Sequence, residues 1–332
     1  MSKNIFCEYI SKDEYFKVID EFLHPTIYVT KPWVLFLEKN IKGDFVFIKL
    51  SNGIQYIYTY GIIFKKGPIR IYGSPFAGWN TGYIGLMSDK EVIDYKSCIE
   101  SLYHFLRKTR KIHYFEFVDK NINVEYAKKN KIRYEFTHNM FIDLKKSEND
   151  ILDSIDKRLA KKWRNYSKHG YEIVECEPNK EFADIFYDQL IEVFARQNLK
   201  PFYSRQRIYS LLDTFKDYKD NILCLHSVDV STANVLSSGI YLKYKKYCVS
   251  IASAYYDSSK KHNMNHPMRI YAIMHMKNEG ADTFDMCGFN PYKAIFGPYI
   301  VDIPLIYKSS IPFLHLFKKI AKAIISNKRK QK

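Results

Sequence analysis

The residues best suited to chemistry stand close together in the last third of the chain. Asp285 and Gly288 end an apolar stretch, and Lys293 follows between Tyr292 and Phe296. Ligands gather beyond the strand ends of α/β sheets. A lysine placed there can stabilise negative charge that develops on a carbonyl oxygen. The alternative is that the two aromatic residues anchor a loop and that Lys293 is exposed to solvent.

Other charged residues could serve the same chemistry. Asp257 and Asp285 are carboxylates that could accept a proton from an attacking amine, or they could simply cap a turn or a strand end. Arg205 and Arg207 open an expected helix just after Tyr203, and arginine binds phosphate bidentately. The alternative is a pair of surface arginines, although the helix dipole mildly disfavours cations in a first turn.

Several classes of function lack a sequence motif. The chain has no GxSxG, HExxH, P-loop or GxGxxG pattern. Its six cysteines and ten histidines are dispersed, which predicts reduced thiols and no metal site. No apolar run reaches the 18 residues of a spanning helix, and the first residues do not read as a signal peptide. We therefore expect a cytoplasmic protein.

The basic charge is concentrated at the C-terminus. Residues 308–332 carry eight Lys and Arg and no acid, which is half of the net charge of +16. Phe313, Leu316, Phe317, Ile320 and Ile324 are spaced as one apolar stripe of a helix. Such a helix could lie in the interface of an anionic membrane, or it could dock on the protein core. Both alternatives remain open from the sequence.

The chain that positions these residues reads as mixed α/β. Residues 149–169 predict one long basic helix that Gly170 ends, and residues 51–53 predict a hairpin turn. Residues 73–85 predict a Gly-rich loop. The other expected helices are 15–23, 32–40, 89–107, 121–130, 180–197, 204–215 and 267–279, and the expected strands are 44–50, 54–64, 113–118, 134–142, 171–176, 222–227, 235–244, 246–256, 283–287 and 299–307.

The two halves repeat one order of elements. In each half a run of antiparallel-looking strands precedes a helix and a short strand, at residues 101–117 and again at 269–286. This order predicts two similar domains, each a mixed, largely antiparallel sheet flanked by helices. The expected parts are an N-terminal domain over 1–148, a connecting helix over 149–170, a C-terminal domain over 171–310 and a basic amphipathic helix over 311–332.

The second half resembles the Fem-type aminoacyltransferases and their relatives in the GNAT acyltransferase superfamily. The resemblance rests on a basic helix that ends in glycine (161–170), the strand after it (171–175), and a helix–Gly–strand–Asp–x–x–Gly unit (272–288). An aromatic-Lys-x-x-aromatic-Gly motif follows at 292–297, and the first half adds a weak match at 30–33. The resemblance extends over about residues 30–307 and lies in the order of the motifs.

The resemblance implies two fused GNAT-like domains and transfer of an acyl or aminoacyl group to an amine. The acceptor would be a lipid- or nucleotide-linked saccharide, or its peptide, that serves the cell envelope as a precursor of peptidoglycan or surface polysaccharide. Lys293 would stabilise the oxyanion, with Asp285 or Asp257 as the proton acceptor. The residues expected to contact substrate are Tyr292, Phe296, Gly297, Arg205, Arg207, Tyr203, Tyr255 and Trp33.

No permanently bound cofactor is expected, and the acyl donor would be aminoacyl-tRNA or acyl-CoA. The family's Gly-rich diphosphate turn corresponds to residues 258–267, which contain no glycine. The inserted helical arm of the larger Fem-type enzymes is absent from the sequence, and Tyr292 stands where phenylalanine is usual. The partners expected are the saccharide acceptor, tRNA and, through residues 311–332, an anionic membrane surface at its inner face. The alternative function is an inactive double-GNAT module that binds nucleic acid or an anionic membrane.

Overall fold

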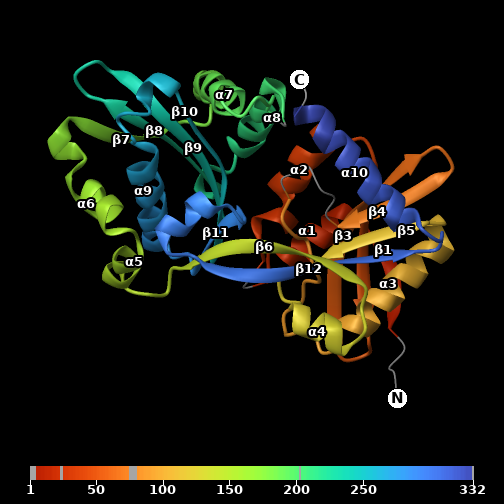
Figure 1. The fold of residues 1–332 in the computed structure, drawn as a ribbon. Coiled ribbons are helices and arrows are strands. Elements are labelled where there is room, and N and C mark those ends of the chain that lie inside the picture. The colour runs from red at the N-terminus through yellow and green to blue at the C-terminus, as the bar shows by residue number, and fades with distance from the viewer. Residues whose placement is uncertain (1–4, 23–24, 75–80, 202, 331–332) are drawn as a thin grey trace. The chain divides into compact units, whose positions relative to one another are not determined.

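The structure is a computed structural model, and it describes residues 5–22, 25–74, 81–201 and 203–330 (Figure 1). The chain forms two compact units. Unit 1 comprises Met1–His138 and Asp302–Ile324, and unit 2 comprises Asn139–Val301 and Ile325–Lys332. The fold is mixed α/β, as the sequence predicts.

Unit 1 is built on strands in the order β1-β2-β3-β4-β5-β12. All neighbours pair antiparallel except β4 and β5, which are parallel. The strands are β1 (Phe6–Ile10), β2 (Asp44–Ser51), β3 (Tyr56–Lys66), β4 (Ile69–Ser74), β5 (Tyr114–Val118) and β12 (Tyr299–Ser309). The helices are α1 (Lys12–Ile19), α2 (Lys31–Asn40), α3 (Tyr95–Arg110) and α4 (Val124–Lys129), with α10 (Leu314–Lys330) beginning in this unit.

Unit 2 repeats the arrangement with strands in the order β7-β8-β9-β10-β11-β6. Here β10 and β11 are the parallel pair, and the other neighbours are antiparallel. The strands are β6 (Tyr134–Asp143), β7 (Tyr171–Cys176), β8 (Ile222–Asp229), β9 (Asn234–Tyr244), β10 (Tyr247–Tyr255) and β11 (Thr283–Gly288). The helices are α5 (Glu148–Ser154), α6 (Lys157–Asn165), α7 (Lys180–Ala195), α8 (Arg205–Phe215) and α9 (Asn265–Asn278). Two short 3-10 helices, η4 (Asp257–Ser259) and η5 (Pro291–Phe296), carry residues of the site described below.

The internal repeat predicted from the sequence is therefore present in the order of elements. Each half of the chain runs strand, two helices, three antiparallel strands, a helix, a strand parallel to the third, a short helix and a last strand. The last strand of each half pairs outside its own half. Residues of β6 pair with β11, and residues of β12 pair with β5. The unit boundaries consequently differ from the expected bounds of 1–148 and 171–310, because 139–148 lies in unit 2 and 302–309 lies in unit 1.

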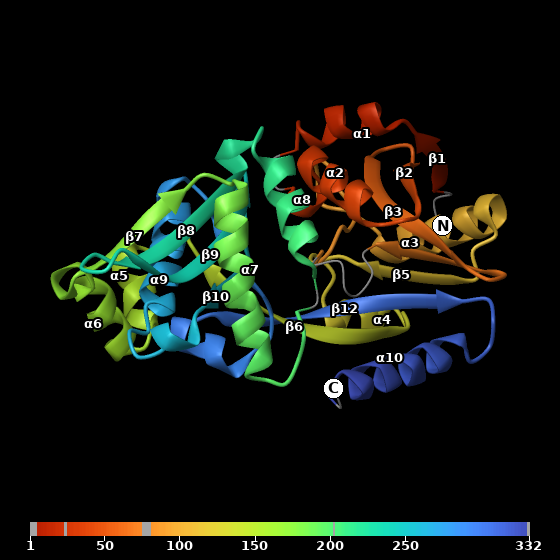
Figure 2. The same cartoon turned by 90° about the horizontal axis from the view of Figure 1, so that it is seen from above.

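The sheet of unit 2 is covered on both faces. Along β8 and β9, His226 stacks on Phe182 of α7, whereas Ser237 on the other face contacts Met268 of α9. Figure 2 shows both helices running along these strands. Unit 1 has its own apolar core, in which α3 residues such as Leu102 and Leu106 pack with Phe115 of β5. The alternating faces follow from the two-residue period of a strand.

The helix expected over 149–169 is broken in the structure. Ile155 has an extended conformation, with φ −81° and ψ 147°, and the side chain of Asp156 caps the new helix α6 by accepting from Arg158 N and Leu159 N. The apolar stripe continues across the break, since Ile151, Ile155 and Leu159 are all buried in one core. Gly170 ends the segment in the left-handed conformation, as predicted, with φ 77°.

The β2–β3 turn depends on a local side chain. The β2–β3 turn forms where the sequence predicts it, because Asn52 Oδ1 accepts from Ile54 N and Gln55 N while Gly53 adopts φ +81°. Strand β4 was not predicted, since residues 73 and 74 were assigned to a Gly-rich loop. Part of that loop, residues 75–80, lies outside the described residues. Every helix among the described residues is too short or too polar to span a bilayer.

Candidate active site

The candidate site lies where the parallel pairing of β10 and β11 ends. The two strands pair only from Tyr247–Thr283 to Val249–Asp285. Beyond Asp285, β11 is irregular, because Cys287 has φ +62° and the pairing with β6 shifts register before Gly288. The Asp285 carboxylate fixes this irregularity, since Oδ1 accepts from Cys287 N at 2.6 Å and Oδ2 accepts from the Tyr247 hydroxyl.

Lys293 is held at this strand end. It lies in η5, which Asn290 caps at the start and Gly297 ends in the left-handed conformation with φ +67°. Lys293 Nζ donates to Met286 O at 2.6 Å and to Gly288 O at 2.8 Å. An ammonium group has three hydrogens, and within the described residues these carbonyls are its two acceptors. One hydrogen therefore remains for a third acceptor.

Gly297 is required by its surroundings as well as by its backbone. A Cβ added there would lie 2.5 Å from Ser154 O, a separation that no side chain tolerates. The end of α5 therefore packs directly against the end of η5. This close approach keeps the loop that carries Lys293 in one position.

Arg269 is a further cation of the site that the sequence reasoning missed. It lies on α9, is only 2% exposed, and donates from Nη2 to Ser253 Oγ at 2.6 Å. Its guanidinium lies 5.4 Å from the ring centre of Tyr292 and 5.3 Å from that of Phe296. No carboxylate in the described residues forms an ion pair with it. Tyr292 and Phe296, both predicted site residues, thus stack on a buried cation. The sequence feature that could have identified Arg269 is a charged residue within an apolar helix face.

The buried cations Lys293 and Arg269 give the site a positive electrostatic potential. Burial is the main cause that lowers the pKa of Lys293, and the charge of Arg269 lowers it further. Burial, together with the charges of Arg269 and Lys162, lowers the pKa of His266 to about 4. His266 is therefore neutral at pH 7, and the charge of Asp285 only partly opposes the lowering of the Lys293 pKa. A site of this kind favours a carbonyl oxygen or an anion.

The two candidate proton acceptors differ in accessibility. Asp285 is 0% exposed and has both oxygens engaged, so its position suits a structural role more than proton transfer. Asp257 has 62% of its side chain exposed and pairs with Arg196 at 2.8 Å. Its backbone N–H donates to Glu192 Oε2 at 2.6 Å. Glu192 is thus a second carboxylate beside Asp257 that the sequence reasoning did not select.

Tyr255 belongs to the same cluster as Asp257. The guanidinium of Arg196 lies 4.3 Å from the Tyr255 ring centre while pairing with Asp257. One arginine at the end of α7 therefore links the end of β10 to η4. Its placement orders the exposed carboxylate of Asp257.

Arg205 is already neutralised by its neighbours. Its guanidinium bridges Asp184 and Asp188 of α7 at 2.5 Å each, and the Tyr209 hydroxyl also donates to Asp184. These contacts join α8 to α7, so Arg205 contributes to the packing of the two helices. Because its guanidinium is already paired with carboxylates, Arg205 is less suited to binding phosphate. Arg207 is half-buried, and burial lowers its pKa.

The two remaining predicted residues are Tyr203 and Trp33. Tyr203 is half-buried ahead of α8, and its neighbour 202 lies outside the described residues. Trp33 belongs to unit 1, is 0% exposed, and donates from Nε1 to Thr81 Oγ1 at 3.0 Å. Trp33 therefore lies in the core of unit 1, and its expected contact with substrate stays a prediction.

The segment expected to correspond to the diphosphate turn lines a pocket in unit 2. This pocket has a volume of about 640 Å³ and is formed by the β8–β9 turn and by Ser258, Ser259, Lys261 and His262. His262 is held by a 2.8 Å hydrogen bond between its Nδ1 and the Tyr171 hydroxyl. The pocket is polar along this segment and adjoins η4, which carries Asp257.

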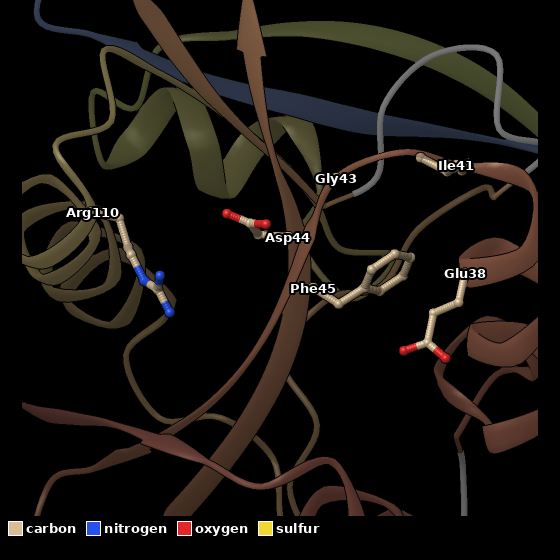
Figure 3. A pocket seen from close by; sticks show the side chains of 6 residues that line it. All are labelled: Glu38, Ile41, Gly43, Asp44, Phe45 and Arg110. Atoms are coloured by element: carbon tan, nitrogen blue, oxygen red, sulfur yellow. The ribbon is translucent and has the colours of Figure 1, made fainter.

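A second pocket lies in unit 1 and contains none of the predicted site residues. Its volume is about 580 Å³, and Glu38, Asp44 and Arg110 supply its charges (Figure 3). Lys12 already pairs with Glu38 at 2.9 Å, and Arg110 lies over the ring of Tyr9. No group of three or more metal-ligating side chains occurs among the described residues of either unit.

The chain has a tandem GNAT fold like that of several solved structures, FemX among them. Among solved structures, the chain is similar to FemX, with a TM-score of 0.67, 11% identity, and coverage of 91% of this chain and 97% of that one. It is also similar to a tandem GNAT protein from the clavulanic acid biosynthesis pathway, with a TM-score of 0.52, 10% identity and coverage of 93% and 99%. The L-PGS from Bacillus licheniformis matches with a TM-score of 0.52, 13% identity and coverage of 92% and 98%.

These similarities concern the fold. No known protein-family model matches the chain, and no curated protein matches it. The expected Fem-type and GNAT architecture is confirmed by the structural neighbours.

Proposed function

We propose that the protein is an acyl- or aminoacyltransferase that acts on an amine of a cell-envelope glycan precursor. The observation that carries the proposal is Lys293, whose ammonium is fixed at the strand end with one hydrogen to spare. The fold supports it, since FemX and the tandem GNAT protein share the architecture. The lipid- or nucleotide-linked amino sugar is the acceptor we propose, and the protein works in the cytoplasm, peripheral on the inner face of the membrane.

The reaction needs three contributions from the chain. The acceptor nitrogen attacks the acyl carbonyl, forming a C–N bond and breaking the bond to the thiol of CoA or to the ribose oxygen of tRNA. Lys293 donates its remaining hydrogen to the carbonyl oxygen as that oxygen gains charge, which lowers the barrier most in the transition state. Asp257, the exposed carboxylate, takes the proton from the amine and passes it to the leaving sulfur of CoA or ribose oxygen of tRNA, which departs as the thiol or hydroxyl.

Arg269 acts through other residues. It stacks on Tyr292 and Phe296, the residues on either side of Lys293, and so holds η5 against α9. Being buried, it does not contact the reacting atoms. We assign it the role of a positioning residue.

The test begins with the donor. The purified full chain is examined by native mass spectrometry for a bound ligand and is then assayed with radiolabelled acetyl-CoA and aminoacyl-tRNA against nucleotide-linked amino sugars. Lys293→Ala should lower turnover by about 10²–10³, the loss typical of one oxyanion donor. Its KM for the donor should change much less, because the contact strengthens only as charge develops.

The matched control is Lys219→Ala, which removes an exposed lysine paired with Glu177 in the same unit. Turnover of this control should equal that of the wild type. Lys293→Arg should recover only part of the activity, because the guanidinium is larger and its donors are aimed differently. An alanine variant at Lys293 that transfers as fast as the control would favour the inactive binding module.

A further inference from the structure

The C-terminal helix α10 docks on unit 1 through its polar side. The ring of His315 stacks on that of Tyr307, with centroids 3.6 Å apart and an interplanar angle of 2°. Its Nδ1 lies 2.7 Å from the Tyr114 hydroxyl. Lys318, one helical turn later, forms an ion pair with Glu116. The side of the helix that faces the protein is therefore polar and charged.

The partner of Lys318 is unusual. Glu116 lies on β5, is 0% exposed, and also accepts from the Tyr114 hydroxyl at 3.1 Å. A buried carboxylate needs a compensating charge, and α10 supplies it. The neighbouring Lys319 adds a second ion pair, with Glu135 at 2.5 Å. These contacts fix the rotation of α10 about its own axis.

The opposite side of the helix is apolar and exposed. Together with Phe313, which directly precedes the helix, its large side chains form the exposed stripe, which consists of Phe313 (72% exposed), Leu316 (52%), Phe317 (64%), Ile320 (48%) and Ile324 (50%). A helix that docks on a soluble protein normally turns such a stripe inward. A contiguous apolar stripe left outside indicates an interaction surface. Figure 1 shows α10 folding back from the end of β12, and the contacts of His315 and Lys318 anchor the start of the helix that carries the stripe.

The charge of the segment selects the partner. Residues 308–332 carry eight Lys and Arg and no acid. Three of them, Lys308, Lys318 and Lys319, pair with glutamates of unit 1, which leaves five cations without such a counter-charge in the ion pairs of the described residues. A symmetric pair of chains joined by this stripe would bring two such segments together, and like charges across an interface cost affinity. An anionic lipid surface instead offers both an apolar interior for the stripe and negative headgroups for the lysines.

We propose that α10 is an interfacial helix that seats the protein on an anionic bilayer by its exposed stripe, in the docked orientation held by Lys318 and His315. The helix lies in the plane of the interface, with the stripe at the acyl boundary. The proposal deepens the peripheral placement in the proposed function, because it names the surface, its orientation and the lipid charge.

The experiment measures vesicle binding by sedimentation with the full chain. The vesicles contain phosphatidylglycerol and phosphatidylcholine in equal parts, or phosphatidylcholine alone. The wild type should bind the anionic vesicles, bind the neutral ones much less, and lose affinity as salt rises. The double variant Phe317→Glu/Ile320→Glu should bind about tenfold more weakly or worse, because charges enter the buried face.

The matched control is Ile54→Glu/Ile93→Glu, which alters two exposed isoleucines of unit 1 (67% and 71%) and changes the net charge equally. It should bind nearly as well as the wild type. Phe313→Ser/Leu316→Ser should also weaken binding, and this variant leaves the charge unchanged. Circular dichroism checks that each variant is folded.

The proposal is overturned if the stripe variants and the control bind alike. It is also overturned if sedimentation equilibrium shows a dimer of the wild type that the stripe variants dissociate, with no vesicle binding. Vesicle binding requires no turnover, so its failure leaves the transferase proposal standing. A chain that binds vesicles by the stripe but transfers no acyl group would instead reject the transferase alone.

Discussion

Removing the ammonium of Lys318 should destabilise unit 1 far more than removing its neighbour. Glu116 is 0% exposed, and in the Lys318→Met variant its charge would retain, among the described residues, only the Tyr114 hydroxyl as a partner. Breaking a buried ion pair from one side costs about 3–5 kcal/mol. Because the Lys318 side chain is itself 30% exposed, we expect the lower end, about 3 kcal/mol. This corresponds to a fall in Tm of roughly 6–12 °C.

The assay is differential scanning calorimetry of the full chain at pH 7, with urea unfolding as a second measure. The matched control is Lys319→Met on the same helix, whose partner Glu135 and own side chain are 33% and 55% exposed. An exposed pair is worth at most about 1 kcal/mol. Lys318→Met/Glu116→Gln should regain most of the loss, because no buried charge remains. Equal Tm values for Lys318→Met and Lys319→Met would refute the reasoning.

Three further predictions concern unit 2. Gly297→Ala should lower the free energy of unfolding, measured by urea titration, by about 1–3 kcal/mol, because the new Cβ would meet Ser154 O. Gly53→Ala is the control: Gly53 also has a positive φ, +81°, but open space around it, so this variant should lower the free energy of unfolding less. Burial lowers the pKa of His226 to about 4, so the folded state excludes a proton that the unfolded state binds. The free energy of unfolding should therefore fall as the pH drops from about 6.5 to 4. The His226→Gln variant should show a flatter dependence of stability on pH. Arg269→Met should raise the pKa of Lys293, read by NMR titration of the dimethylated lysine, because the Arg269 charge lowers it; an unchanged or lower value would contradict this assignment.

Local patterns in the sequence were sufficient for much of the fold. The hairpin turn at Asn52–Gly53 and the helix end at Gly170 form as predicted, because each depends on a side chain or a φ value within a few residues. The break at Ile155 was missed. The apolar period continues through it, so burial alone does not distinguish one helix from two.

Long-range pairing explains the larger differences. A strand pattern shows which face of a strand is buried but not which strand lies beside it, so the pairing of β12 with β5 was not foreseen. The same limit applies to α10, whose stripe was recognised although its outward orientation depends on the buried Glu116 of another element.

The candidate site residues also differ in whether a local sequence pattern or only the packing of the structure identifies them. Lys293 was found from its place after a strand end, whereas Arg269 became visible only once α9 and η5 were packed together. Trp33 was selected for its position in a motif, and its burial depends on neighbours such as Tyr28 that the motif does not include.

The pairing of each half's last strand outside that half has a consequence for synthesis of the chain. When the ribosome has made residues up to 148, β5 is complete, but its antiparallel neighbour in β12 lies more than 150 residues ahead. The edge of β5 stays open during that interval, and open edges invite mispairing. A fragment ending at residue 148 should therefore aggregate, while the same fragment co-expressed with the remainder should recover. Folding of unit 1 finishes last even though most of it is made first.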